Sequence, residues 1–256
     1  MHAVIDRYDR TWSRFRTDST VASIAQRAGT WPLPGEAVPL FDLYRRLYLA
    51  TDGAMSPLVG LALERLGYDR AYSLRPSGPV GPVPAWEDML AWDGEALTTV
   101  APVVLDVGAA GKGQLVDLVG EVLSAAGHDE WIVDASGDLR VSGPSIRVGL
   151  EHPLDPTKAI GVANVGDRAL CASAVNRRAW GDGLHHVIDA TTGLPTGRVI
   201  ATWAVAATAM EADGLATALF FADPDRLAQE FEFEWVTVRS DLTVACSPGL
   251  DGEVFR

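Results

Sequence analysis

Lysine and cysteine are both scarce in this chain of 256 residues. Of its 21 basic residues only Lys112 and Lys158 are lysines, so arginine is the usual cation and each lysine is an exception. The two cysteines, Cys171 and Cys246, are far apart in the sequence and lack the spacing of metal ligands. Their placement argues against a thiolate metal site, fits a reducing compartment and favours two small core residues.

Excess positive charge and long apolar stretches are absent as well. The formal net charge of −13 argues against a nucleic-acid partner, because phosphate backbones are bound by clustered positive charge. No stretch approaches 18 apolar residues, and residues 1–7 lack the basic and apolar regions of a signal peptide. The sequence as given therefore predicts a cytoplasmic protein with no membrane segment of its own. An export signal upstream of the given start is left open.

Hydrophobic residues make up 48% of the chain, enough to build the core of one large domain or of two lobes. Their spacing predicts a succession of helices and hairpins, which is typical of the α+β class. The expected helices contain residues 5–15, 21–24, 40–48, 61–66, 115–123 and 210–221. The expected strands contain residues 89–92, 96–100, 103–105, 131–133, 140–142, 146–150, 160–165 and 200–207.

The loop at residues 106–113 is rich in glycine and connects an expected strand to an expected helix. Its glycines allow a backbone to approach a ligand closely, and the amides of a new helix favour an anion. A compact lysine ammonium, here Lys112, fits such a turn better than a guanidinium. A P-loop is disfavoured, because that motif needs a Ser or Thr after its lysine and Gly113 follows here. The loop alone fits either a phosphate site or an ordinary strand-to-helix turn.

Two neighbouring histidines lie in the segment 184–195, where a strand leads into a turn. Alternation along a strand places His185 and His186 on opposite faces, which makes a poor two-ligand metal site. The pair therefore indicates one working imidazole and one bystander, with Asp189 nearby as a further titratable group. A histidine in a loop is also commonly a hydrogen-bonding surface residue.

A carboxylate and a hydroxyl, those of Asp213 and Thr217, are spaced four residues apart in the last expected helix. This spacing places both on one face, one turn apart. Their apolar flanks predict partly buried surroundings, in which two hard oxygen donors would suit a magnesium ion. The alternative is that Asp213 caps its own helix and Thr217 bonds back to a carbonyl.

Five separated segments together resemble the ApbE family of FAD:protein FMN transferases. The family patterns are S-x-F-x-x-D-S, D-G-A-F-D-P-x-V-G, D-x-G-A-x-A-K-G, H-x-I-D-P-x-T-G and A-D-A-L-A-T. They match, in that order, residues 13–19, 52–60, 106–113, 186–193 and 212–217. The family's first strand, with its M-G-T segment, is missing from this chain. Other departures are Ala25, Ser56, Ala190, Asp134 with Ser136, and Ala172 with Ala174.

The resemblance implies a magnesium-dependent transferase that takes FAD as substrate. It would move the FMN half to a threonine or serine hydroxyl of an acceptor protein, a post-translational flavinylation, and release AMP. The implied metal ligands are Asp213, Thr217 and the backbone carbonyl of Ala109, with Ala216 nearby. The implied FAD contacts are Phe15, Ala54, Met55, Ser56, Asp106, Lys112 and His186. His186 or Asp189 would assist removal of the acceptor proton.

The resemblance also implies one ApbE-like domain over residues 1–256. This domain would have mixed, largely antiparallel sheets, flanking helices and a ligand cleft between lobes. Two other functions stay open at this point. One is an FAD pyrophosphatase that gives FMN and AMP, and the other is a flavin-binding protein without catalysis.

Overall fold

The computed structural model describes residues 1–255 and divides the chain into two compact units. The first unit comprises Met1–Ala109 and Arg178–Thr196, and the second begins at Ala110, leaves out residues 178–196 and continues from Gly197 to the C-terminus. The glycine-rich loop at residues 106–113 therefore contains a junction between the units.

The helices of the first unit are built on a buried aromatic and aliphatic core. In α3, Leu40, Leu43 and Leu47 recur at helical spacing and are buried, as their periodicity predicts. Phe41, on the same helix, stacks on Trp92 and meets Trp12 and Trp86 at an angle. The helices are α1 (His2–Trp12), α2 (Thr20–Ile24), α3 (Ala37–Ala50), α4 (Gly60–Arg65) and α5 (Trp86–Met89).

The strands of the first unit form one small sheet and two ribbons, all antiparallel. The sheet has the order β1-β3-β2, with β1 at Gly29–Pro32, β2 at Leu90–Trp92 and β3 at Ala96–Thr99. As expected, β2 and β3 form a hairpin, in which Asp93 accepts two backbone hydrogen bonds and Gly94 has a φ of +97°. The ribbons pair β9 (Ala179–Trp180) with β10 (Leu184–His185), and β11 (Ile188–Asp189) with β12 (Leu194–Pro195).

The strand expected at residues 103–105 does not form. The Val103 amide donates to the carbonyl of Ile24, and the Asp106 amide donates to the carbonyl of Pro57. Leu105 is buried, so the apolar run correctly indicates that this segment lies in the core. These bonds go to the last residue of α2 and to the short 3-10 helix at Pro57–Val59 instead of to a neighbouring strand, so the segment is irregular.

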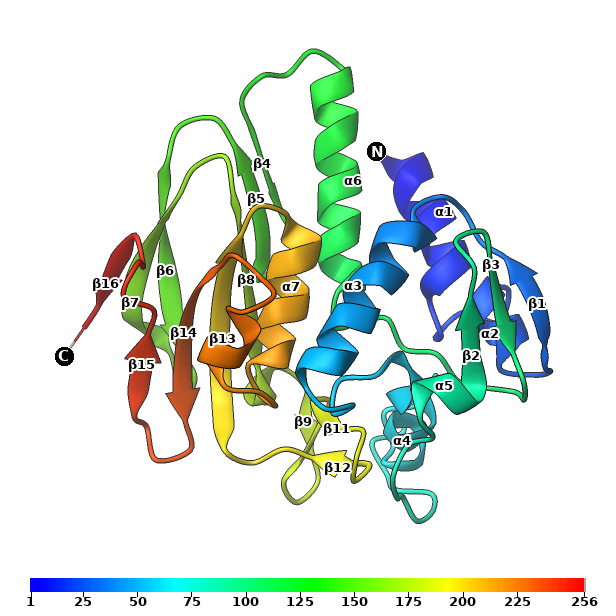
Figure 1. Ribbon diagram of the computed structural model, residues 1–256. Coiled ribbons are helices and arrows are strands. Elements are labelled where there is room, and N and C mark those ends of the chain that lie inside the picture. The colour runs from blue at the N-terminus through cyan, green and yellow to red at the C-terminus, as the bar shows by residue number, and fades with distance from the viewer. Residues whose placement is uncertain (256) are drawn as a thin grey trace. The chain divides into compact units, whose positions relative to one another are not determined.

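The second unit contains a six-stranded antiparallel sheet with the order β15-β14-β13-β8-β5-β4 (Figure 1). A second sheet has the order β16-β7-β6. The strands of the larger sheet are β4 (Trp131–Asp134), β5 (Asp138–Ser142), β8 (Ala169–Ala174), β13 (Val199–Ala206), β14 (Glu234–Arg239) and β15 (Val244–Cys246). Those of the smaller sheet are β6 (Ile146–His152), β7 (Asp155–Val165) and β16 (Gly252–Val254).

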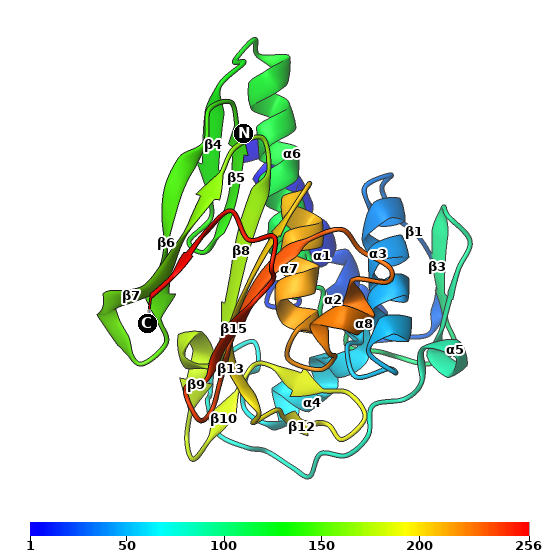
Figure 2. The ribbon, with the colours of Figure 1, turned by 60° about the vertical axis from the view of Figure 1, so that its left-hand side comes forward.

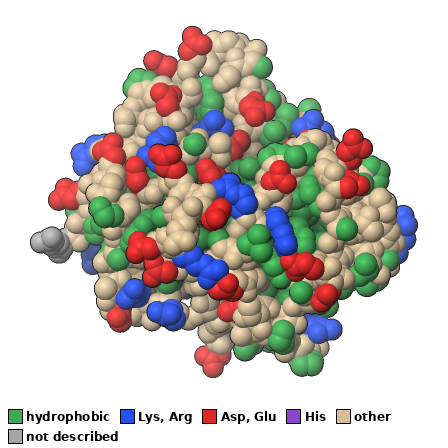
Figure 3. Space-filling view, viewed as in Figure 1, with side chains coloured by type: hydrophobic (Ala, Val, Ile, Leu, Met, Phe, Trp, Pro, Cys, Tyr) green, Lys and Arg blue, Asp and Glu red, His purple; other side chains and the backbone are tan. Residues whose placement is uncertain are grey.

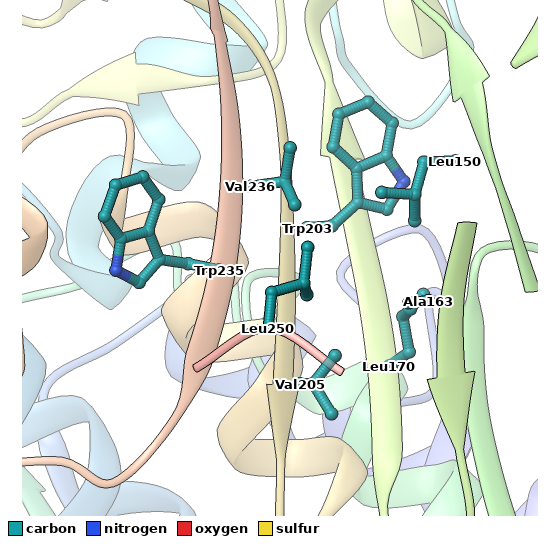
Figure 4. Close-up of a pocket in the computed structure, with 8 residues that line it drawn as sticks. All are labelled: Leu150, Ala163, Leu170, Trp203, Val205, Trp235, Val236 and Leu250. Carbon is teal, nitrogen blue, oxygen red and sulfur yellow. The ribbon is translucent and has the colours of Figure 1, made fainter. Parts of the chain in front are cut away.

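Helices and the smaller sheet cover opposite faces of the six-stranded sheet (Figures 1 and 2). On one face lie α6 (Gly111–Ala125), against β4 and β5, and α7 (Ala209–Ala218), against β8 and β13. The chain continues from α7 to the short helix α8 (Pro224–Leu227). The other face packs against β6 and β7 through an apolar core that includes Leu150, Trp203 and Val205. The side chains drawn in Figure 4 leave no room for a water molecule between them.

Strand β5 shows how the sequence separates the two faces of the sheet. Leu139 and Val141 point into the apolar core, whereas Asp138 and Arg140 form ion pairs with residues of α6. Side chains alternate across a strand, so these polar residues necessarily share the helical face. Antiparallel sheets with flanking helices confirm the predicted α+β class.

Charge on the surface is mixed. On the face shown in Figure 3, acidic and basic side chains are interspersed. The ion pairs at the surface include Arg10 with Asp6 and Lys158 with Asp155. Among residues 1–255, no helix combines the length and the apolar character needed to cross a membrane.

Candidate active site

Asp213 lies inside α7 and is almost completely buried, with 4% of its surface exposed. Its Oδ2 accepts a hydrogen bond of 2.9 Å from the amide of Gly113, the third residue of α6. The N-cap of α7 is Thr208, whose side chain accepts from the Glu211 amide. The alternative in which Asp213 caps its own helix is therefore wrong, because its carboxylate instead binds an amide in the first turn of α6.

Thr217 lies one turn after Asp213 on α7, as the spacing predicted. Its hydroxyl is 3.5 Å from that of Ser173 on β8. Residue 216, named with the metal ligands, is buried, and its carbonyl accepts a hydrogen bond of 2.6 Å from the Thr202 hydroxyl. At this end of α7 the side-chain oxygens of Thr217 and Ser173 are thus close to each other, while the Ala216 carbonyl already has a donor.

Lys112 is the second residue of α6, and its ammonium group is surrounded by oxygens of the same unit. It forms an ion pair of 2.9 Å with Asp138 and donates to the carbonyls of Ala135, at 3.2 Å, and Ser136, at 3.3 Å. The Asp138 side chain is 1% exposed and that of Lys112 is 39% exposed. A buried carboxylate on β5 therefore fixes a lysine whose side chain still reaches solvent.

The donors on this face of α7 suit magnesium better than a softer metal. They are the Asp213 carboxylate and the Thr217 hydroxyl of α7 together with the Ser173 hydroxyl of β8, all hard oxygens. No group of three or more His, Cys, Asp or Glu side chains within residues 1–255 could hold a metal ion. Magnesium is commonly bound by one or two carboxylates and completes its coordination with water or substrate phosphate, so this sparse set fits it.

In the first unit, Asp106 is bound by its neighbours on two sides. Arg14, whose side chain is 4% exposed, donates from Nε to Asp106 at 2.6 Å, and the Gly108 amide donates at 2.8 Å. Burial disfavours the charged carboxylate, but the adjacent Arg14 guanidinium outweighs it and keeps the pKa of Asp106 below its ordinary value. Asp106 therefore carries a fixed negative charge at the start of the glycine-rich loop.

An aromatic cluster surrounds the Arg14 guanidinium. Phe15 stacks in parallel on Tyr72 with ring centroids 5.0 Å apart, and it meets Tyr68 edge to face at 5.4 Å. Arg14 lies over the Phe15 ring at 4.2 Å, and Arg178 lies over Tyr68 at 5.8 Å. Burial raises the pKa of Tyr68, so its hydroxyl stays protonated. The cluster offers flat aromatic surface beside two cations.

Residues 54–56, which were expected to line the flavin, are all buried in the first unit. The Ala54 carbonyl accepts from the Ala190 amide, and the Met55 amide donates to the Thr51 hydroxyl. Ser56 caps the short 3-10 helix Pro57–Val59 by accepting from the Leu58 amide. These contacts give the segment a supporting role in its unit, and its contact with flavin stays a prediction.

The two histidines have different surroundings, and only His185 lies in a strand, at the end of β10. Both ring nitrogens of buried His185 are bound to backbone groups, those of Thr196 and Val187. The Nδ1 of His186 is buried with no hydrogen-bond partner among residues 1–255. Burial, followed by the positive charge of Arg178, lowers the pKa of His186 to about 4. Backbone groups thus occupy both ring nitrogens of His185, whereas His186 presents a neutral imidazole, and a catalytic part for His186 stays a prediction.

Asp189 forms the turn that follows the histidines. One of its carboxylate oxygens accepts from the amide of Thr191 at 2.8 Å and from its hydroxyl at 2.6 Å. Its carbonyl accepts from the amides of Thr192 and Gly193. The structure therefore gives Asp189 a turn-forming role, and its proposed part in catalysis stays a prediction.

Comparison with known proteins now identifies the family, because a family model described as ApbE family matches residues 1–236. The chain belongs to the ApbE family. An FAD:protein FMN transferase of Vibrio cholerae is 27% identical over 242 residues, which cover 86% of this chain and 69% of the relative. One of Klebsiella pneumoniae is 24% identical over 265 residues, which cover 90% and 72%.

The fold agrees with this membership. The crystal structure of the ApbE protein from Thermotoga maritima superimposes with a TM-score of 0.84 at 22% sequence identity. The match covers 96% of this chain and 88% of that one. The predicted family, fold class and assignment to the transferases are confirmed, whereas magnesium dependence and the acceptor hydroxyl stay predictions.

The residues that the ApbE resemblance named are divided between the two units. The first unit contains the predicted flavin contacts from Phe15 to Asp106, together with Ala109, His186 and Asp189. The second contains Lys112, Asp213, Ala216 and Thr217. In the first unit, electrostatic interactions link Asp106, Arg178 and His186. Each unit therefore gathers its own share of the predicted site, and the individual roles stay predictions.

Sequence reasoning missed four residues that hold these groups in place: Arg14, Asp117, Ser173 and Asp138. Arg14 could have been identified from the sequence, because it lies inside the matched ApbE segment at residues 13–19. Asp117 could also have been identified, because it is a carboxylate among apolar neighbours in an expected helix and so needs a partner. Nothing local distinguished Ser173, and the sequence around Asp138 predicts a turn, whereas the structure places Asp138 at the start of β5.

The lowered pKa of His186 predicts a pH dependence of stability. The unfolded chain takes up a proton near pH 6.5 and the folded chain only near pH 4, so the free energy of unfolding falls as pH drops through this window. Between pH 7.5 and pH 4 we expect the free energy of unfolding to fall by about 2 kcal/mol more in the wild type than in His186→Gln, after allowance for partial exposure of the ring. Urea unfolding measures the difference. Exposed His128, changed to Gln, is the control, and equal losses in wild type and His186→Gln would contradict the prediction.

Proposed function

We propose that this protein transfers the FMN moiety of FAD to a threonine or serine hydroxyl of an acceptor protein in a magnesium-dependent reaction. The acceptor oxygen forms a bond to the FMN phosphorus, the diphosphate P–O bond breaks, and AMP leaves. The observation that carries the proposal is the junction of α6 and α7. There, a buried carboxylate, two hydroxyls and the start of a long helix occur in one unit.

In the second unit, Asp213 and Thr217 would hold the magnesium ion, with Ser173 beside them. When bound, the ion would neutralise charge on the diphosphate oxygens. Lys112 adds a cation whose direction is fixed by Asp138, and the N-terminus of α6 favours an anion. The backbone carbonyl of Ala109, the third ligand implied by the family resemblance, belongs to the first unit.

In the first unit, the Arg14 and Asp106 pair and the cluster of Phe15 and Tyr68 would bind the nucleotide and the flavin ring. His186 is neutral at physiological pH because its pKa is about 4, so it can accept a hydrogen bond or a proton from the acceptor hydroxyl. Phosphoryl transfer has a loose transition state in which positioning and charge neutralisation matter more than a strong base. A weakly basic imidazole is therefore sufficient here.

Product analysis tests the proposal. The protein is incubated with FAD, magnesium chloride and a purified flavin-acceptor domain, and the products are separated by chromatography. Covalent FMN on the acceptor, with an equal amount of AMP, supports transfer. Free FMN and AMP without labelled acceptor would contradict transfer and show that the protein is an FAD pyrophosphatase. Bound but unchanged FAD would contradict transfer and show that the protein binds FAD without catalysis. Omission of magnesium should abolish the reaction. We also propose a cytoplasmic location, which fractionation of cells would test.

A further inference from the structure

Helices α6 and α7 bind each other through a reciprocal pair of carboxylates. Asp213 of α7 accepts from the Gly113 amide in the first turn of α6. Asp117 of α6 accepts from the first two amides of α7, those of Ala209 and Met210, each at 2.9 Å. Each carboxylate thus satisfies amides that the first turn of the other helix leaves without an intrahelical acceptor.

The two helices also touch backbone to backbone at this point. A Cβ on Gly113 would lie 2.8 Å from the Cβ of Asp213 and would overlap the carbonyl of Ala209. Any side chain at position 113 would therefore push α7 away from α6. The position of Asp213 is set by contacts with α6 at the start of α7 and at Gly113.

Asp117 is bound on its other side by Arg140 of β5, with 2.6 Å between Nη1 and Oδ1. The side chains are 27% and 12% exposed, respectively. The guanidinium balances the charge of a carboxylate that has already accepted two amides. Asp117 therefore joins three elements, namely α6, the start of α7 and β5.

We propose that Asp117 is a positioning residue for the magnesium-binding face of α7, an inference that rests on the proposed function. Asp213 is the fifth residue of α7 and Thr217 the ninth, so both move with the start of that helix. By holding the first two amides, Asp117 sets the place of the two oxygens that would bind the ion. Groups that orient metal ligands in this way commonly affect metal affinity by about 10- to 100-fold.

The test compares Asp117→Asn with Glu121→Gln, which removes the same charge from an exposed position one turn later on α6. Magnesium binding is measured by calorimetry on the protein without FAD, and transfer is measured as a function of magnesium concentration. For Asp117→Asn we expect about tenfold weaker magnesium binding and a matching rise in the half-saturating concentration. Turnover at saturating magnesium should stay within about threefold, and the Ala209 and Met210 amides should exchange hydrogen faster. Glu121→Gln should match the wild type.

Magnesium binding within twofold of the wild type in folded Asp117→Asn would overturn the inference. If that variant does not fold, Arg140→Gln is the test of the inference. It keeps the hydrogen bonds from the Ala209 and Met210 amides to Asp117 and removes only the guanidinium that holds the Asp117 carboxylate. A measurable loss of magnesium affinity in Arg140→Gln supports the inference, and none overturns it. The proposed function fails separately, if the wild type itself produces no flavinylated acceptor.

Discussion

Replacing Asp213 with asparagine is expected to lower magnesium-dependent FMN transfer by at least about a hundredfold while leaving the fold intact. A metal ion contributes several kcal/mol to the transition state, and each 1.4 kcal/mol changes the rate about tenfold. The asparagine carbonyl can still accept from the Gly113 amide, so the bond between α6 and α7 survives. Alanine would leave that buried amide unsatisfied at a cost of about 1–3 kcal/mol, and it would confuse loss of metal with loss of structure.

The measurement for Asp213→Asn is the initial rate of transfer over a range of magnesium concentrations, together with the thermal midpoint. Thr217→Val should act in the same direction and less strongly, because it removes a neutral oxygen. Glu121→Gln again serves as the charge control. A rate for Asp213→Asn within about twofold of the wild type at every magnesium concentration would remove Asp213 from the metal site.

Replacing Lys112 with methionine is expected to destabilise the protein by about 3 kcal/mol, because it leaves the carboxylate of Asp138 buried without its cation. The double variant Lys112→Met/Asp138→Asn removes both charges and should recover most of this loss. Its FAD affinity should nevertheless stay about tenfold weaker than that of the wild type, since the ammonium proposed to face the diphosphate is gone. Comparison of the single and double variants would thus distinguish the effect of Lys112 on stability from its effect on FAD binding.

The only other lysine, Lys158, provides a matched control for that experiment. It forms an exposed pair with Asp155, with 70% of its own side chain exposed, so Lys158→Met should change neither the urea midpoint nor FAD binding appreciably. Fluorescence titration gives the FAD affinity. Additive losses in the double variant would show that Lys112 and Asp138 are not coupled. Wild-type FAD affinity in Lys112→Met would assign the lysine a purely structural role.

Features that depend on local spacing were predictable from the sequence. Leu40, Leu43 and Leu47 recur at helical spacing and are buried in α3, and Asp213 and Thr217 share one helix as their separation requires. The irregular segment at residues 103–105 shows the limit of such reasoning. An apolar run indicates that a segment is buried, but it does not show whether a neighbouring strand is present for that segment to pair with.

Partners far apart in the sequence were not predictable in the same way. Arg14 and Asp106 are 92 residues apart, as are Asp117 and Ala209, and Asp213 reaches back 100 residues to Gly113. The sequence showed that carboxylates among apolar neighbours need partners, but tertiary packing decides which partners they find. The sequence left open whether Asp213 caps its own helix, and the structure shows that its carboxylate instead binds an amide of α6.

The central claim is magnesium-dependent transfer of FMN that requires the face of α7 containing Asp213. Intact mass spectrometry of a flavin-acceptor domain, after incubation with FAD and the protein, tests this claim most directly. We predict that wild type and Glu121→Gln add one FMN to the acceptor when magnesium is present and none when it is chelated. Asp213→Asn should add almost none under either condition. Equal labelling by wild type and Asp213→Asn, or labelling that persists after chelation, would contradict the account.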